Sequence, residues 1–190
     1  MSAPTDEPAA DAALLARVRD GSAAERRAAE RELFERHAPS VERMLRRMLG
    51  TDTEDCLQEV FLDVFGGLPA FEGQAKLSTW IYRVAMRRAW KCAAQRQRHR
   101  RGTEEDAGLV EHAAAPGPAV DAELDAEELA RRFAAALDRL DLDQRAVMAL
   151  SAVDGLGPGE IAEVLGVPVG TVHSRLHRAR GRMREWLGLA

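Results

Sequence analysis

Apolar residues recur every three or four positions along most of this chain, and no long stretch alternates apolar with polar residues. That period is typical of amphipathic helices with one buried face, whereas strict alternation would predict strands. We therefore predict an all-α protein. The expected helices cover residues 12–19, 23–49, 53–68, 78–98, 122–140, 143–153, 159–165 and 169–187.

One segment, residues 102–121, interrupts this period, because glycines and prolines stand there among alanines and acids without an apolar repeat. We predict a flexible acidic linker at this place. It would join two small helical domains, residues 12–101 and 122–190, and a disordered N-terminus would cover residues 1–11.

The last two expected helices predict a helix-turn-helix, with a tight turn at Gly166 and the small Ala162 where the helices cross. Residues spaced to bury one face of the pair are Ile161, Leu165, Val167, Val172 and Leu176. The second helix is basic, since residues 170–184 hold five arginines, two histidines and no acid. Its outward face can therefore meet phosphates while its first turns reach base edges in the major groove of duplex DNA.

Two earlier helices have polar or aromatic faces of their own. In the helix at 53–68 the expected buried stripe is Leu57, Val60, Phe61, Val64, Phe65 and Leu68, and the opposite side bears Asp55, Gln58, Glu59 and Asp63. In the helix at 78–98 one side bears Thr79, Tyr82, Arg83, Met86 and Trp90. Unpaired bases stack on exposed aromatic rings, so this side could hold single-stranded DNA. Ordinary core positions for Trp80 and Tyr82 remain the alternative.

The net charge of −4 argues against a nucleic-acid partner only until it is divided by segment. Residues 76–101 hold nine Lys or Arg and no acid, whereas residues 103–128 hold nine Asp or Glu and no Lys or Arg. No run of about 18 apolar residues and no basic-then-apolar leader occurs. We therefore expect a cytoplasmic protein that is not itself inserted in a membrane.

No catalytic, metal or cofactor site is expected from the sequence. Cys56 and Cys92 lie far apart without a Cys/His cluster, which predicts neither a zinc site nor a disulfide scaffold. His173, Ser174 and His177 share one helix, but no carboxylate there orients either imidazole for hydrolytic chemistry. We expect a protein that is not an enzyme and has no small-molecule substrate.

Four blocks in order, residues 32–41, 52–62, 71–85 and 137–172, resemble the bacterial sigma-70 family, specifically its small two-domain extracytoplasmic-function (ECF) group. The resemblance implies an alternative sigma factor that binds core RNA polymerase and directs promoter-specific transcription initiation. Residues 12–101 would be sigma region 2, and residues 122–190 would be region 4. The implied partners are the clamp helices and flap of core polymerase, promoter DNA and an anti-sigma factor.

The resemblance also implies which residues bind each partner. Polymerase binding would fall to Asp55, Gln58 and Glu59. Recognition and melting of the −10 element would fall to Phe71, Gly73, Lys76, Thr79, Tyr82, Arg83 and Arg87. Contacts with the −35 element would fall to Gly170, Thr171, His173, Ser174, Arg175, His177 and Arg178; of these, we expect Arg175 and Arg178 to bind mainly phosphates.

Four positions depart from the family pattern: Cys56 replaces a common leucine, Lys76-Leu77 a serine-phenylalanine pair, Met86-Arg87 an arginine-asparagine pair, and His173 a lysine. Two other functions compete with the sigma-factor interpretation. A dimeric helix-turn-helix repressor or activator would use the front helices as a dimer seam or ligand pocket. A serine recombinase would need a β-rich catalytic domain with an activated serine near its start.

Overall fold

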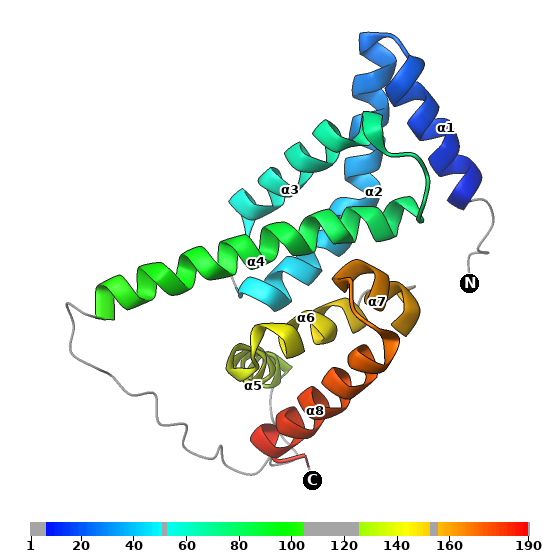
Figure 1. The fold of residues 1–190 in the computed structure, drawn as a ribbon. Coiled ribbons are helices and arrows are strands. Elements are labelled where there is room, and N and C mark those ends of the chain that lie inside the picture. The colour runs from blue at the N-terminus through cyan, green and yellow to red at the C-terminus, as the bar shows by residue number, and fades with distance from the viewer. Residues whose placement is uncertain (1–6, 51–52, 105–125, 153–155, 190) are drawn as a thin grey trace.

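The computed structural model describes residues 7–50, 53–104, 126–152 and 156–189. All regular elements in these ranges are helical, which confirms the predicted all-α class (Figure 1). They are α1 (Glu7–Asp20), α2 (Ala23–Leu49), α3 (Glu54–Gly67), a 3-10 turn η1 (Leu68–Ala70), α4 (Leu77–Glu104), α5 (Ala126–Arg139), α6 (Leu142–Ser151), α7 (Pro158–Leu165) and α8 (Val169–Leu187). None of these helices has the length and apolar character needed to cross a membrane.

The first half of the chain folds as an antiparallel pair, α1 and α2, followed by α3 lying along α4 (Figure 1). A capping box starts α2, since the Ser22 amide donates to the Glu25 carboxylate at 2.8 Å. Helix α1 begins at Glu7, inside the segment 1–11 that we expected to be disordered. Its start is held to α2 by an ion pair of 3.1 Å between Asp11 and Arg36, and its buried Leu14 anchors the helix.

The second half consists of α5 to α8. Asp141 caps α6 by accepting a 2.8 Å hydrogen bond from the Gln144 amide, and Glu160 caps α7 by accepting one of 2.9 Å from the Gly157 amide. Helix α8 covers the predicted residues 169–187. A small apolar cluster joins α5 to α8; its members are Ala136, Leu137, Leu140, Ala179, Met183 and Leu187.

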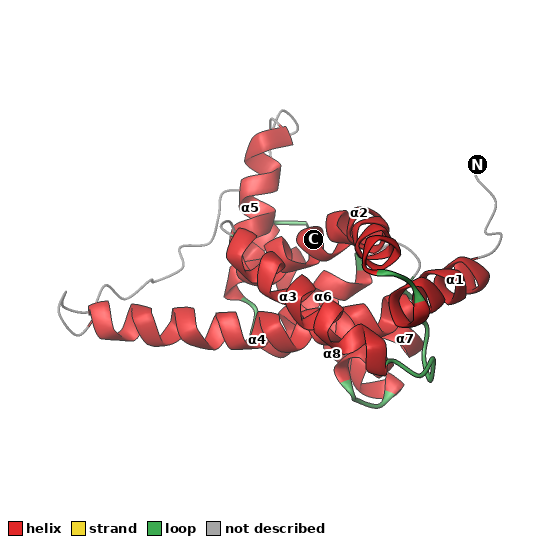
Figure 2. Cartoon of the chain, turned by 90° about the horizontal axis from the view of Figure 1, so that it is seen from above, coloured by secondary structure: helices red, strands yellow, loops and turns green. Residues whose placement is uncertain are grey.

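The two halves pack against each other rather than standing apart. Helix α7 lies against α4 and α6 against α2, whereas the far end of α4 projects beyond the other helices (Figure 2). One continuous cluster of buried apolar residues includes Leu45 of α2, Ile81 of α4, Leu150 of α6 and Ile161 of α7. Helix α4 continues to Glu104, past the predicted start of the linker at residue 102, and the rest of that predicted linker lies outside the described residues.

Candidate functional site

The helix-turn-helix forms at the predicted place. Gly166 ends α7 in the left-handed conformation at φ 66°, which favours glycine, and the Val167 amide then donates to Ala162 O at 3.1 Å. Ala162 and Ile161 are buried, as are Val172 and Leu176 of α8, whereas Leu165 and Val167 are only half-buried.

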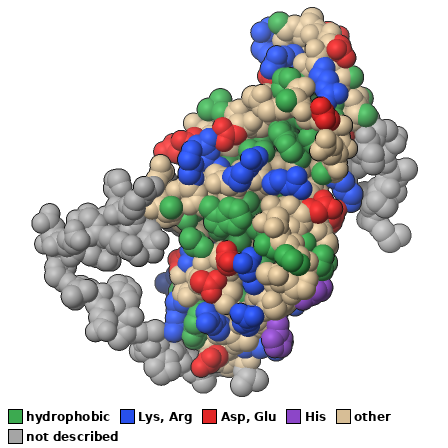
Figure 3. Space-filling model, in the orientation of Figure 1, with side chains coloured by type: hydrophobic (Ala, Val, Ile, Leu, Met, Phe, Trp, Pro, Cys, Tyr) green, Lys and Arg blue, Asp and Glu red, His purple; other side chains and the backbone are tan. Residues whose placement is uncertain are grey.

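The outward face of α8 holds the candidate −35 residues. Gly170, His173, His177 and Arg178 are exposed, and the histidines drawn in Figure 3 lie on the surface beside Lys and Arg side chains. Thr171, Ser174 and Arg175 are half-buried, and the Ser174 hydroxyl donates to Thr171 O at 3.0 Å. Along α8, opposite its buried stripe of Val172, Leu176, Ala179 and Met183, there is thus a polar and basic surface that no helix of the described residues covers.

Two arginines of α8 are tied to the helix behind it. Arg175 forms an ion pair with Asp143 of α6, and Arg182 donates to the Gln144 side chain at 3.2 Å. Arg178, in contrast, is exposed and makes no ion pair within the described ranges. These contacts fix α8 on α6 and leave Arg178 as the more accessible of the two expected phosphate-binding arginines.

The candidate polymerase-binding residues share the exposed side of α3. Asp55, Gln58 and Glu59 are all exposed, while Val60 and Phe61 are buried on the other side. Leu57 and Phe65 are only half-buried, so the predicted apolar stripe is narrower than the sequence indicated.

Two residues belonging to this surface were not singled out from the sequence. Leu62 lies on the polar side of α3 and, at 71%, is the most exposed large apolar side chain among the described residues. Arg88 of α4 reaches across to α3, where it bonds Glu59 at 3.2 Å and also pairs with Asp63. The hydrogen bond to Asp63 is the largest cause of a raised pKa of Arg88; the charges of Asp63 and Glu59 add to the shift, whereas burial opposes it. A leucine among polar neighbours was the one available sequence signal for Leu62.

The loop before α4 holds three candidate −10 residues in different settings. The Phe71 ring is buried and packs against Trp80 with centroids 5.2 Å apart. Gly73 is exposed and adopts φ 77°, a left-handed conformation suited to glycine. Lys76 is exposed, but its ammonium pairs at 2.7 Å with Glu160 of α7. That pair and the Gly157 amide lower the pKa of the Glu160 carboxyl.

The expectation of an exposed aromatic face on α4 is wrong for the structure in which the two halves pack together. Tyr82 is 5% exposed and Thr79 1% exposed, and Trp90 is half-buried. The reason is that α4 packs on α3, α2 and α7, so more than one stripe of its surface is buried. Of the remaining −10 candidates, Arg87 is exposed and Arg83 is half-buried, with its Nε lacking a hydrogen-bond partner among the described residues.

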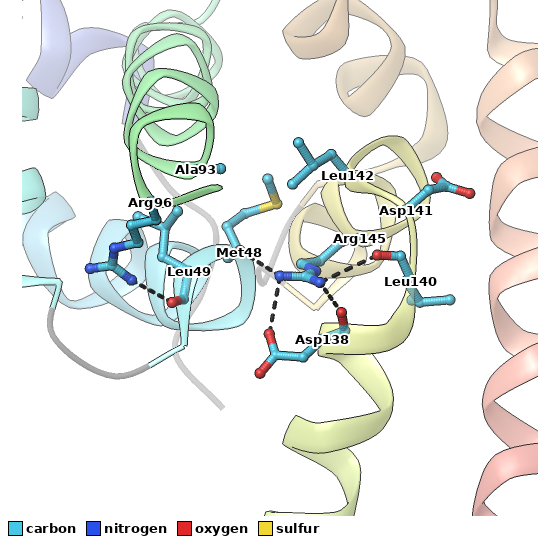
Figure 4. A pocket seen from close by; sticks show the side chains of 9 residues that line it. All are labelled: Met48, Leu49, Ala93, Arg96, Asp138, Leu140, Asp141, Leu142 and Arg145. Atoms are coloured by element: carbon cyan, nitrogen blue, oxygen red, sulfur yellow. Dashed lines mark hydrogen bonds and ion pairs between the residues drawn. The ribbon is translucent and has the colours of Figure 1, made fainter. Parts of the chain in front are cut away.

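A second contact between the halves surrounds a cavity of about 490 Å³ at the end of α2 (Figure 4). Arg145 of α6 donates to Met48 O at 3.2 Å and to Leu140 O at 3.3 Å, and it pairs with Asp138 at 3.0 Å. Arg96 of α4 donates to Leu49 O at 2.5 Å on the opposite wall. The interface between the halves is thus apolar at one part and open and charged at another.

Comparisons with known proteins agree on one family. The family described as Sigma-70 region 2 matches residues 33–100, and the family described as Sigma-70, region 4 matches residues 130–183. The chain is 33% identical over 176 residues to the RNA polymerase sigma factor CarQ of Myxococcus xanthus, which covers 92% of this chain and 95% of CarQ. It is 31% identical over 134 residues to the ECF RNA polymerase sigma-E factor of Escherichia coli (strain K12), covering 68% of this chain and 70% of that factor.

A solved structure supports the fold. The sigma factor RpoE of Bartonella quintana, crystallised with the anti-sigma factor NepR, superposes with a TM-score of 0.62 at 23% identity, covering 83% of this chain and 95% of that one. The absence of strands from the described ranges also disfavours the recombinase alternative, which would need a β-rich domain.

Proposed function

Because the chain belongs to the sigma-70 family, we propose that its two halves read two promoter elements after core polymerase has separated them. It is an alternative sigma factor of the ECF group, which binds core RNA polymerase and directs promoter-specific transcription initiation. In this proposal residues 12–101 are region 2, residues 122–190 are region 4 and residues 102–121 link them. The protein acts in the cytoplasm as a dissociable subunit without catalysis of its own.

Helix α8 is the proposed reader of the −35 element. Its first turns, which bear Gly170, Thr171, His173 and Ser174, would face base edges, and so would His177 one turn after His173. Arg178 would hold a phosphate, because it is exposed and no acid of the described residues neutralises it. Arg175 would contribute less, since Asp143 already neutralises its charge in the free protein.

The exposed side of α3 is the proposed polymerase-binding surface. Its centre is Leu62, and the polar rim is formed by Asp55, Gln58 and Glu59. Protein interfaces typically combine an apolar anchor with a polar rim, so this composition favours docking of a partner over simple solvation. Asp63, bound to Arg88, extends the acidic part of the same side.

Reading of the −10 element is proposed to need a change of arrangement. The ion pair between Lys76 and Glu160 brings a −10 residue into contact with the helix-turn-helix. The 19 residues of α8 span about 28 Å. The two promoter elements are about 25 base pairs apart, or about 85 Å along the duplex at 3.4 Å per base pair. In the packed molecule the two sets of candidate DNA-binding residues lie much closer together than the two promoter elements. The molecule therefore cannot bind both elements at once, and α7 must leave α4 before the −10 element is read.

The observation that supports this proposal best is the contrast in exposure between the two readers. The face of α8 is open, whereas Tyr82 and Thr79, which would meet the −10 bases, are buried. Unstacking of bases costs a few kcal/mol per step, and the packed form offers no exposed Tyr82 ring to offset that cost. Promoter opening is therefore expected only in the holoenzyme.

Permanganate footprinting tests this expectation on a promoter identified by transcript mapping. Thymines of the −10 region should become reactive with the protein plus core polymerase, and stay unreactive with either component alone. Reactivity with the protein alone would overturn the proposal and favour an autonomous DNA-binding regulator.

Carbodiimide cross-linking tests the separation of the halves directly, because it joins an amine to a carboxylate only where the two are in contact. Lys76 and Lys91 are the only lysines of the chain, so the products are few. A link between Lys76 and Glu160 should form in the free protein and disappear in the holoenzyme. Glu160→Gln is the matched control, since glutamine at this position also completes a capping box while it cannot be activated. Persistence of the link in transcribing holoenzyme would contradict the proposed separation.

An anti-sigma factor is a further proposed partner, since the structurally similar RpoE was solved with one. A protein that binds both halves at once would keep α7 on α4 and so prevent −10 reading. Co-purification of this sigma factor with such a partner should preserve the cross-link between Lys76 and Glu160, whereas loss of the link on binding would contradict this role.

A further inference from the structure

The two cysteines, far apart in sequence, meet between α3 and α4. The Sγ atoms of Cys56 and Cys92 are 3.0 Å apart, and both thiols are free. Cys56 is buried and Cys92 half-buried. Within the described part of the chain no group of three or more His, Cys, Asp or Glu could hold a metal ion, so the pair is not one edge of a metal site.

We propose that Cys56 and Cys92 form a dithiol that hydrogen peroxide oxidises to a disulfide between α3 and α4. A disulfide brings its two sulfur atoms to about 2 Å, so the pair has to close by about 1 Å. Helices α3 and α4 are already packed along each other, and the two side chains already face one another. The bond therefore needs a side-chain adjustment and no rearrangement of the fold.

The two thiols differ in their reactivity. Burial raises the pKa of the Cys56 thiol to about 12, with smaller contributions from the hydrogen bond and charge of Cys92. Thiolates are the nucleophiles in thiol chemistry, so Cys56 is a poor first reactant near neutral pH. Cys92 is closer to solvent and is the thiol that peroxide reaches first.

The reaction balances in two steps. The Cys92 sulfur attacks one oxygen of hydrogen peroxide, the O–O bond breaks, and a sulfenic acid and one water form. The Cys56 sulfur then attacks the Cys92 sulfur; it loses its proton, the S–S bond forms, the S–O bond breaks and a second water leaves. Two thiols have been oxidised by two electrons in total, and one peroxide has been reduced to two waters.

The disulfide would fix α3, which bears the exposed residues Asp55 and Glu59, to α4. Arg88, one turn before Cys92, already links α4 to Glu59 at 3.2 Å, so the covalent bond would reinforce an existing contact. A disulfide between Cys56 and Cys92 closes the segment of chain between them into a loop and so restricts the unfolded chain. It should therefore raise the thermal midpoint of the protein by about 10 °C. The site is independent of the proposed separation of the two halves, because both cysteines lie in the first half.

The test treats the full-length protein with hydrogen peroxide and measures intact mass, a non-reducing peptide map and thermal unfolding. We expect a mass lower by two hydrogen atoms, a linked pair of peptides containing Cys56 and Cys92, and a higher thermal midpoint that a reducing agent reverses. In Cys56→Ala, Cys92 should stop at the sulfenic acid, which a dimedone probe captures.

Three outcomes would overturn the proposal: added oxygen atoms without linked peptides in the wild type, disulfides only between molecules, or a linked form whose midpoint is unchanged or lower. The principal measurement, peroxide treatment of the wild-type protein, uses no variant, so its result does not depend on whether a variant folds.

Discussion

The buried His37 of α2 should make this protein sensitive to mild acid. His37 is 6% exposed, and its Nε2 has no hydrogen-bond partner among the described residues. Burial, and to a smaller extent the nearby charge of Arg36, lowers the pKa of His37 from 6.5 to about 4. The imidazole therefore stays neutral in the folded protein at a pH where it is already protonated in the unfolded chain.

The sign and size of the effect follow from this difference. A base with a lowered pKa in the folded state binds fewer protons there, so stability is complete above pH 6.5 and falls as the pH decreases towards 4. At about 1.4 kcal/mol for each pH unit, the fall amounts to about 3 kcal/mol across this window. That is a large part of the free energy of unfolding of an ordinary domain.

Urea unfolding at several pH values between 4 and 8 measures this contribution in the variant His37→Leu. The variant should match or slightly exceed the wild type at pH 8, because it removes an unpaired buried nitrogen, and should be more stable by about 3 kcal/mol at pH 4. Carboxylates with lowered pKa, such as Glu160, contribute equally to both proteins and cancel in the difference. His173→Leu, at an exposed site, is the control for replacing a histidine by a leucine. Parallel curves for wild type and His37→Leu would refute the reasoning.

Four substitutions test the surfaces and packing described above. Glu59→Arg reverses a charge at the proposed polymerase-binding surface, and the folded variant should bind core polymerase about tenfold more weakly in a pull-down titration, a loss of about 1.4 kcal/mol; unchanged binding would remove that assignment. Arg178→Ala should weaken DNA binding on all sequences alike and reduce the salt slope by about one, whereas a changed −35 preference would mean that Arg178 reads bases. Gly67→Ala would place a Cβ 3.0 Å from the Trp80 ring, while Gly66→Ala meets nothing within 4 Å. Thermal melts should therefore show Gly66→Ala to be the more stable of the two; the reverse order would contradict the close contact with Trp80.

The features that the sequence predicted well are local ones. The bounds of α8 agree with the predicted 169–187 because its apolar stripe and its start after Pro168 depend on neighbours within a few turns. The turn at Gly166 likewise follows from one residue that tolerates a left-handed conformation. Helix α1 was predicted too short, because its first turns depend on a distant ion pair of Asp11 with Arg36.

The features that the sequence did not predict depend on contacts between distant segments. Nothing local in α4 shows that α2, α3 and α7 all pack on it, so Tyr82 was expected on an exposed face although it is buried. The meeting of Cys56 with Cys92 and the reach of Arg88 to α3 likewise depend on how two helices are placed side by side. Periodicity gives the faces of a helix but does not say which partner covers each face.

The outward face of α8 is exposed, whereas the candidate −10 residues Thr79 and Tyr82 are buried. This difference in exposure bears on the order in which the protein contacts the two promoter elements. Helix α7 packs against both α8 and α4, and among the described residues this arrangement leaves the outward face of α8 exposed. An ion pair as exposed as that of Lys76 with Glu160 contributes at most about 1 kcal/mol, so the shared apolar cluster must supply most of the closure. Since the proposed polymerase-binding surface of α3, with Leu62, stays exposed in the packed form, we expect that core polymerase can bind it before the halves part. We infer that polymerase binding comes first and separation of the halves second, and that stable contact with the −10 element comes last.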